Sequence, residues 1–221
     1  MLQCIKCKSV VQSVHGYGDG SKAPGIEGIG TSLYIAAHNQ IRAHAKAYRL
    51  YQNEFAATQG GQCGITLNTE WGEPEDPNDP ASVEAAENNM QFYLGWFMHP
   101  IYVNGDYPDV MREKVSISST GASQVYIKSI DNSDKCYLIF HSQIDTKSEL
   151  QGFPESRLPT FTAEESAEIL GSHDFLGINF YTSGLGFAQE GDITDISYWA
   201  DKDAGAKPDP KWYPYVSTHK Y

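Results

Sequence analysis

Cysteine is scarce in this sequence, with only Cys4, Cys7, Cys63 and Cys136 among 221 residues. Four cysteines are too few to hold together a disulfide-based fold of this length. Cys4 and Cys7 form a lone Cys-x-x-Cys pair, and a zinc site needs a second pair of ligands at suitable spacing. We therefore expect no metal and no other cofactor. A small α/β protein with redox chemistry at Cys4 and Cys7 stays open as a minor alternative.

Long apolar runs and positive charge are also scarce. No run approaches the ~18 apolar residues that cross a bilayer, and the first eight residues lack the apolar core of a secretion signal. From this we expect either a protein that stays inside the cell or an N-terminus that is missing. Sixteen Lys and Arg face 28 Asp and Glu, giving a formal charge of −12. This charge repels phosphate backbones and argues against a nucleic-acid partner or an anionic membrane surface.

The apolar pattern predicts helices alternating with strands. One helix is expected from Thr31 or Ser32 to about Phe55, and a second from Asp79-Pro80 to His99, where Pro100 should end it. A strand is expected from Cys63 to Trp71, and a capping box predicts a short helix over 162–170. The nearly continuous apolar stretch 174–182 is typical of a strand buried on both faces of a parallel sheet. These elements indicate an α/β fold.

Two segments depart from this alternation. Residues 116–144 are rich in serine and β-formers, with a turn signal near 131–134, and predict an inserted β-hairpin. The tail from Gly184 to Tyr221 has no clear period, so we expect long loops with one short helix there.

Several short motifs together resemble glycoside hydrolase family 1, the β-glucosidase and lactase-like enzymes. They occur in the order of that family and are Gly16-Tyr17-Gly18-Asp19-Gly20, Gln59-Gly60-Gly61, Trp71-Gly72-Glu73-Pro74, Gly105-Asp106-Tyr107-Pro108, Ser156-Arg157-Leu158-Pro159 and Asp174-Phe175-Leu176-Gly177-Ile178-Asn179-Phe180-Tyr181-Thr182. The resemblance implies a partial (β/α)₈ TIM barrel, with residues 1–221 forming the middle of one domain and 116–144 an atypical insert. That insert is either a hairpin or translated non-coding sequence.

The resemblance also implies a reaction. Members of this family are retaining glycosidases that hydrolyse β-linked glucosides and galactosides with two glutamates and no cofactor. The acid/base glutamate belongs to an Asn-Glu-Pro motif, which would fall near Ile5-Lys6-Cys7, and the nucleophile belongs to a Thr-Glu-Asn-Gly motif. Neither motif is in the sequence, so we expect these 221 residues to be inactive. The alternative is a non-catalytic module that binds a sugar or a protein. Animal enzymes of this kind are secreted, luminal or membrane-anchored, whereas oligomeric state leaves no trace in the sequence.

Few site residues can be assigned from the resemblance. Tyr181 matches a tyrosine that supports the nucleophile, and Asn179 matches a polar neighbour in the same pocket; both could instead be ordinary strand-end residues. Glu70, Trp71 and Glu73 follow the preceding strand and could line the pocket mouth, although an aromatic at that place could equally pack between helices. We interpret His38 and His44 as helix residues that pack inward, because neither has a nucleophile partner in view.

Overall fold

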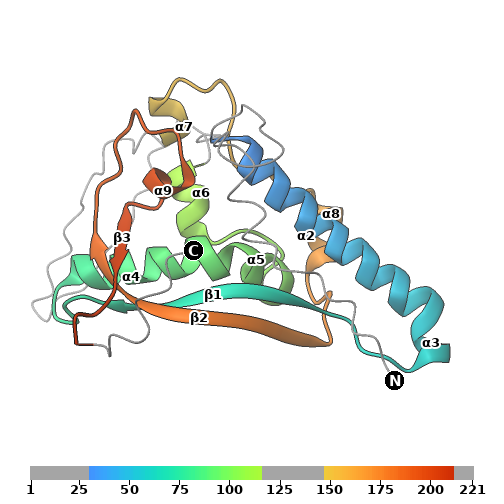
Figure 1. The fold of residues 1–221 in the computed structure, drawn as a ribbon. Helices are drawn as coiled ribbons and strands as arrows, with labels where there is room; N and C mark the ends of the chain where they lie inside the picture. Colours follow the sequence, from blue (N-terminus) through green and yellow to red (C-terminus); the bar gives the residue numbers. More distant parts are fainter. Residues whose placement is uncertain (1–29, 116–146, 212–221) are drawn as a thin grey trace, which may run out of the picture.

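The computed structural model describes residues 30–115 and 147–211, which contain three strands and a set of helices (Figure 1). The predicted hairpin at 116–144, and Cys4, Cys7 and Cys136, lie outside these residues. The helices are α2 (Ser32–Leu50), α3 (Ala56–Gln59), α4 (Pro80–Met90), α5 (Trp96–Met98), α6 (Asp109–Val115), α7 (Lys147–Leu150), α8 (Ala163–Ile169) and α9 (Tyr198–Asp201), with the π-helical turns η1 (Tyr51–Phe55), η2 (Gln91–Gly95) and η3 (His99–Val103). The strands are β1 (Gly64–Pro74), β2 (Phe175–Ala188) and β3 (Ala204–Lys207).

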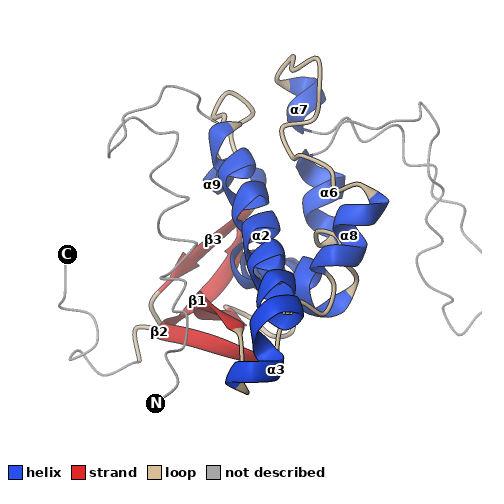
Figure 2. Ribbon diagram, turned by 90° about the vertical axis from the view of Figure 1, so that its right-hand side faces the viewer, coloured by secondary structure: helices blue, strands red, loops and turns tan. Residues whose placement is uncertain are grey.

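The three strands form one sheet in the order β1-β2-β3. β1 and β2 are parallel, as the alternation of strands and helices predicts, whereas β3 returns antiparallel beside the end of β2. In the parallel pair Ile65 lies opposite Leu176 and Asn68 lies opposite Asn179, and the register shifts between Thr69 and Trp71. Figure 2 shows α2, α6 and α8 on one side of the strands. The described chain is thus an open α/β segment, consistent with part of a barrel.

The long helix α2 confirms the first helical prediction and extends it. Its buried stripe includes Leu33, Ala37 and Ile41, which are spaced three or four residues apart as expected. The helix continues through η1 and α3 and ends at Gly60, whose φ of 60° an L-residue seldom adopts. The prediction that Phe55 belongs to the buried stripe is wrong, because by that point the helix has run past the core and Phe55 is 44% exposed.

The second predicted helix is also longer than expected. It runs beyond Pro100 to Val103, because the π-helical turns η2 and η3 replace the regular hydrogen-bond ladder around the proline. Each π turn adds a residue and rotates the buried face. As a result Phe92 and Trp96 are fully buried, although they lie off the predicted stripe. Val83, which belongs to that stripe and precedes both turns, is 45% exposed.

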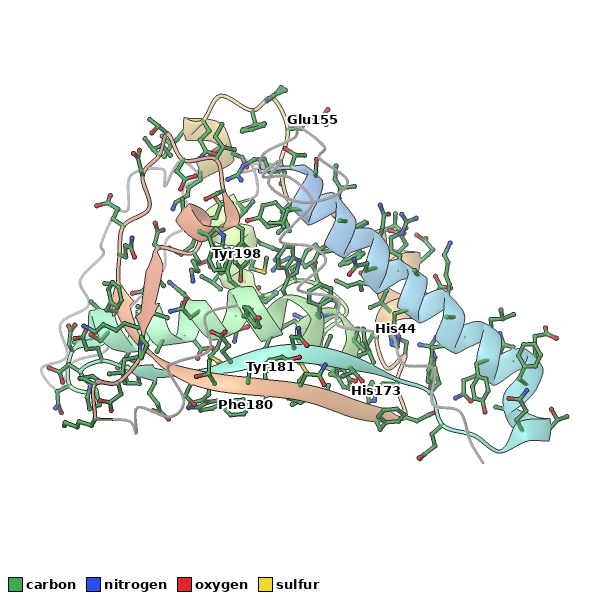
Figure 3. All side chains as sticks on the ribbon, in the orientation of Figure 1. His44, Glu155, His173, Phe180, Tyr181 and Tyr198 are labelled. Carbon is green, nitrogen blue, oxygen red and sulfur yellow. The ribbon has the colours of Figure 1, made fainter. Side chains whose placement is uncertain are left out.

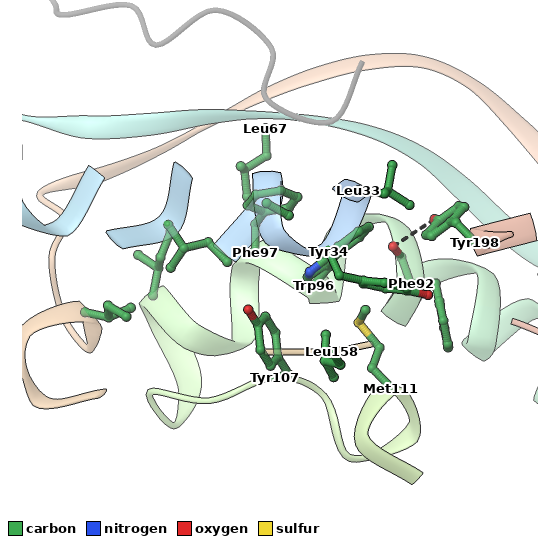
Figure 4. Packing of buried hydrophobic residues seen from close by; sticks show 14 of the residues in the cluster. Leu33, Tyr34, Leu67, Phe92, Trp96, Phe97, Tyr107, Met111, Leu158 and Tyr198 are labelled. Atoms are coloured by element: carbon green, nitrogen blue, oxygen red, sulfur yellow. Dashed lines mark hydrogen bonds between the residues drawn. The ribbon is translucent and has the colours of Figure 1, made fainter. Parts of the chain in front are cut away.

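The core lies between α2, the α4 to η3 helix and β1 (Figure 4). Trp96 stacks on Tyr198 with ring centroids 5.5 Å apart, and Tyr34 packs against Trp96 at 5.2 Å. The Tyr198 hydroxyl donates to the carbonyl of Phe92 at 2.8 Å. These aromatic contacts connect α9, near the end of the described chain, to the helices that precede the insert.

The capping box at the start of α8 is confirmed. The Thr162 side chain accepts from the Glu165 amide at 3.2 Å, and the Glu165 carboxylate accepts from the Thr162 amide at 3.0 Å. Both groups would otherwise be unpaired at a helix start.

One prediction for the C-terminal third is wrong, and another is incomplete. β2 is not buried on both faces. Leu176, Ile178 and Phe180 are 36%, 49% and 57% exposed, because no described helix covers that face of β2. The segment after Gly184 contains the expected loops but also strand that the sequence did not predict, since β2 continues to Ala188 and β3 follows. The one short helix expected there is present as α9. Pairing between distant segments, rather than local period, creates this extra sheet.

Candidate functional site

Near the middle of β1 and β2, polar residues from two distant parts of the sequence lie side by side. Asn179 on β2 donates its amide Nδ2 to Oδ1 of Asn68 on β1 at 3.0 Å. Asn68 is 1% exposed, so this contact pairs a polar group that burial would otherwise leave unsatisfied. The parallel register positions the two side chains directly across from each other. Asn68 was not among the residues predicted for the site, although its partner Asn179 was.

Tyr181 lies two residues after Asn179, where the register between the two strands shifts (Figure 3). Its side chain is 63% exposed. Within the described residues its hydroxyl makes no hydrogen bond, so it differs from Tyr34 and Tyr198, whose hydroxyls are bonded inside the core. A phenol in this state can bond a group that approaches this part of β2.

Of the three residues predicted for the pocket mouth, two line a cavity and one does not. Trp71 donates its indole Nε1 to the Glu73 carboxylate at 2.5 Å and is 52% exposed, so it does not pack between helices. Glu70 and Trp71 line a cavity of about 720 Å³, whereas Glu73 does not. Asn179 and Tyr181 also lie outside the cavity lining. Asn179 and Tyr181 therefore form a polar surface on β2 that is separate from the cavity lined by Glu70 and Trp71.

Electrostatic effects concentrate around Glu70. Burial raises the pKa of Tyr93, and the negative charge of Glu70 raises it further. Burial lowers the pKa of Lys202 to about 8, and Glu70 opposes that change. Perturbed groups around a concave site mark it as a candidate for function.

The other residues that line this cavity were not predicted from the sequence. Asn89 and Tyr93 come from α4 and η2, and Trp199 and Lys202 come from α9 and the residue after it. Nothing in their local pattern indicates a site, because they come from a helix and from a tail predicted to be mostly loop. Only the packing of α9 and β3 beside α4 brings them together.

Comparison with known families identifies the family of this chain. A model of glycosyl hydrolase family 1 matches residues 7–219. The chain belongs to this family. Curated relatives include the lactase/phlorizin hydrolase of Rattus norvegicus, 38% identical over 91% of this chain, and the lactase-like protein of Mus musculus, 39% identical over 89%. The human cytosolic beta-glucosidase is 36% identical over 91% of the chain. The chain spans 9%, 30% and 37% of these three relatives, respectively.

Solved structures of family 1 members share the fold. An aphid myrosinase matches 93% of this chain with a TM-score of 0.72 at 30% identity, and the chain covers 37% of it. A rice beta-glucosidase matches 90% with a TM-score of 0.67, also at 30% identity, and the chain covers 36% of it. These neighbours are TIM-barrel enzymes, so the expectation of a partial (β/α)₈ barrel is confirmed.

The two helix histidines pack inside this part of the barrel, as predicted. His38 lies 2.8 Å from the Tyr107 hydroxyl and stacks on Phe161 with ring centroids 4.3 Å apart. His44 Nε2 donates to the Ser172 carbonyl at 2.7 Å. Burial lowers the pKa of both imidazoles, which suits neutral structural residues.

Two other kinds of site are absent from residues 30–115 and 147–211. In that part of the chain no three His, Cys, Asp or Glu side chains are grouped so that they could hold a metal ion. Among its helices, none is long and apolar enough to cross a membrane.

Proposed function

We propose that this chain is part of a retaining β-glycosidase that hydrolyses the O-glycosyl bonds of β-glucosides or β-galactosides. The observation that supports it most directly is the family match over residues 7–219, and Asn179 and Tyr181 of the matching motif lie together on β2. In barrel enzymes the active site lies at the carboxyl ends of the strands, the end toward which β2 continues from Tyr181 to Ala188. A structure of a 30% identical rice beta-glucosidase variant is a covalent complex with glucose, as expected of a retaining mechanism.

In such a mechanism one glutamic acid protonates the leaving oxygen while a second, ~5 Å away, attacks the sugar carbon. The exposed, free hydroxyl of Tyr181 suits the role that the resemblance implies, a hydrogen bond to the attacking carboxylate. Such a bond stabilises the ionised carboxylate and orients it toward the sugar. Asn179 would contribute through its amide, which is already held in place by Asn68.

The 221 residues themselves contain neither glutamate motif. We therefore propose that this chain alone does not turn over substrate. A second function, a module that binds sugars without cleaving them, is favoured by the same absence together with the cavity at Glu70 and Trp71.

The test has two arms. The native transcript is sequenced beyond both ends of the chain and across 116–144, its product is expressed, and release of the leaving group from an aryl β-glucoside is measured. If both glutamate motifs are encoded, we expect turnover, and we expect Tyr181→Phe to lower kcat while Tyr51→Phe, on η1, leaves it unchanged. A product that contains both motifs but shows no β-glycosidase activity refutes the proposal.

The second arm uses the chain as printed. Pure 221-residue protein should release no leaving group above the uncatalysed rate. Turnover that Tyr181→Phe abolishes would contradict the proposed inactivity of this chain.

A further inference from the structure

The cavity of about 720 Å³ is separate from Asn179 and Tyr181, neither of which lines it. Its walls come from the end of β1, from α4 and η2, from β3, and from the segment 189–202 that includes α9. Figure 1 shows β3 and α9 on the same side of β1 and β2 as α4. A side chain that lines this cavity is therefore not part of the polar surface around Tyr181.

Lys202 is the unusual residue in this cavity. It is 8% exposed, yet within residues 30–115 and 147–211 no carboxylate lies within ion-pair distance of its amine. Lys114, Lys147 and Lys207, by contrast, each pair with a carboxylate. Burial disfavours the charged form and lowers the pKa of the Lys202 amine to about 8. About a tenth of this amine is therefore uncharged at pH 7, compared with roughly one part in 2,500 for an ordinary lysine.

The hydrogen bonding of the Lys202 amine is incomplete among the described residues. An ammonium carries three N–H groups. In residues 30–115 and 147–211 the amine donates one hydrogen bond, to Oδ1 of Asn89 at 2.6 Å. Asn89 is itself held in place, because its Nδ2 donates to the Gly205 carbonyl at 2.9 Å. The site therefore suits a nitrogen that is cationic but has a single N–H group, and a protonated imine is such a nitrogen.

The surroundings of the amine favour a positive charge on this nitrogen. The amine lies 5.0 Å from the ring centre of Trp199, and an indole face attracts cations. The negative charge of Glu70 on β1 acts in the same direction. The cavity is also lined by three exposed carboxylates, those of Glu190, Asp192 and Asp195. These charges favour a reaction that keeps the nitrogen cationic over one that neutralises it, such as acylation, and they repel an anionic reagent.

We propose that Lys202 is a nucleophilic amine that captures small neutral aldehydes in this cavity as a protonated imine. The nitrogen lone pair attacks the carbonyl carbon, and the C–N bond forms while one amine proton passes to the carbonyl oxygen. That oxygen leaves as water with the second amine proton, and the C=N nitrogen then takes up a proton. The one remaining N–H donates to Asn89, and the charge stays beside Trp199. The reaction uses neither Tyr181 nor a catalytic glutamate, so it goes beyond the proposed hydrolytic function.

The experiment incubates the full 221-residue chain at neutral pH with benzaldehyde and sodium cyanoborohydride, which reduces each imine to a stable benzylamine. Peptide mass mapping then gives the initial rate of benzylation at each lysine. Because Lys202 has roughly 200 times more uncharged amine than an ordinary lysine, we expect it to react at least about tenfold faster than Lys46 on the exposed face of α2. In urea that unfolds the chain, the two lysines should react at similar rates.

A charged aldehyde and paired variants test the surroundings of the amine. 4-Carboxybenzaldehyde is anionic and should lose most of the preference for Lys202 over Lys46, because the acidic lining repels it. Asn89→Asp gives the amine a carboxylate partner, which stabilises the ammonium and should lower the rate at Lys202 at least about tenfold. Asn53→Asp adds the same charge on the exposed surface of η1 and should leave that rate unchanged.

Several results would overturn the proposal. They are a rate at Lys202 in the unmodified chain no greater than the rate at Lys46, an equal preference with the anionic aldehyde, and equal rates at Lys202 in the two asparagine variants. The unmodified chain decides the question even if Asn89→Asp fails to fold. Tyr181→Phe should leave benzylation of Lys202 intact, so loss of β-glycosidase activity and loss of this reaction are distinguishable.

Discussion

The buried ion pair between Arg157 and Asp201 offers the sharpest test of how this fold is held together. Nη1 and Nη2 of Arg157 donate to the two carboxylate oxygens at 2.8 and 2.6 Å, and both side chains are 0% exposed. The Tyr34 hydroxyl donates to the same carboxylate at 2.7 Å. The group thus joins α2, the loop before α8, and α9, the helix that borders the cavity.

The perturbation is Asp201→Asn, which keeps the shape but removes the negative charge. It leaves the Arg157 guanidinium buried without a counter-ion, which costs about 3–5 kcal/mol. That is a large part of the ~5–15 kcal/mol by which a typical domain is stable. For a chain of this size the loss corresponds to a fall in Tm of roughly 6–20 °C.

The assay is urea unfolding followed by circular dichroism, with Arg112→Met as the control. Arg112 also contacts two carboxylates, those of Asp106 and Asp109, but its side chain is 49% exposed. Its loss should cost less than about 1 kcal/mol. The double variant Arg157→Met with Asp201→Leu should regain part of the stability, because it removes both charges but leaves the buried Tyr34 hydroxyl without its acceptor. An Asp201→Asn variant about as stable as Arg112→Met would refute the reasoning.

Three further predictions follow from other contacts. Gly186→Ala should cost roughly 1–3 kcal/mol in urea unfolding, because its new Cβ would lie 2.7 Å from Cα of Ala86, whereas Gly184→Ala, with 3.4 Å to its nearest neighbour, should be tolerated. Thr162→Ala should cost about 1 kcal/mol through the lost cap of α8, while the exposed Thr58→Ala should not. Burial lowers the folded-state pKa of His44, so its contribution to stability is complete above the unfolded value near ~6.5 and is lost as pH falls through the folded value. The urea midpoint should therefore drop between about pH 7 and pH 5.5, and drop less in His44→Gln; an unchanged pH dependence in that variant would contradict this account.

Part of the candidate site could be predicted from the sequence. Motifs that are contiguous in the chain, such as the stretch that contains Asn179 and Tyr181, identified the family and the presence of a strand there. The importance of Asn68 could not be read in the same way, because it depends on the register between β1 and β2. The roles of Asn89, Trp199 and Lys202 depend on contacts between segments more than a hundred residues apart.

The same division holds for the fold. Local physics was sufficient for α2 and for the α8 capping box, because helical spacing and end-caps involve residues three or four positions apart. Tertiary structure alone decided that the second helix runs past Pro100, that β2 continues to Ala188, and that β3 pairs with it. It also decided that Arg157 and Asp201 are buried together. In each of these cases the stabilising contacts join groups that are distant in sequence. The spacing of apolar residues along the chain does not predict such contacts, because they form only when the chain folds.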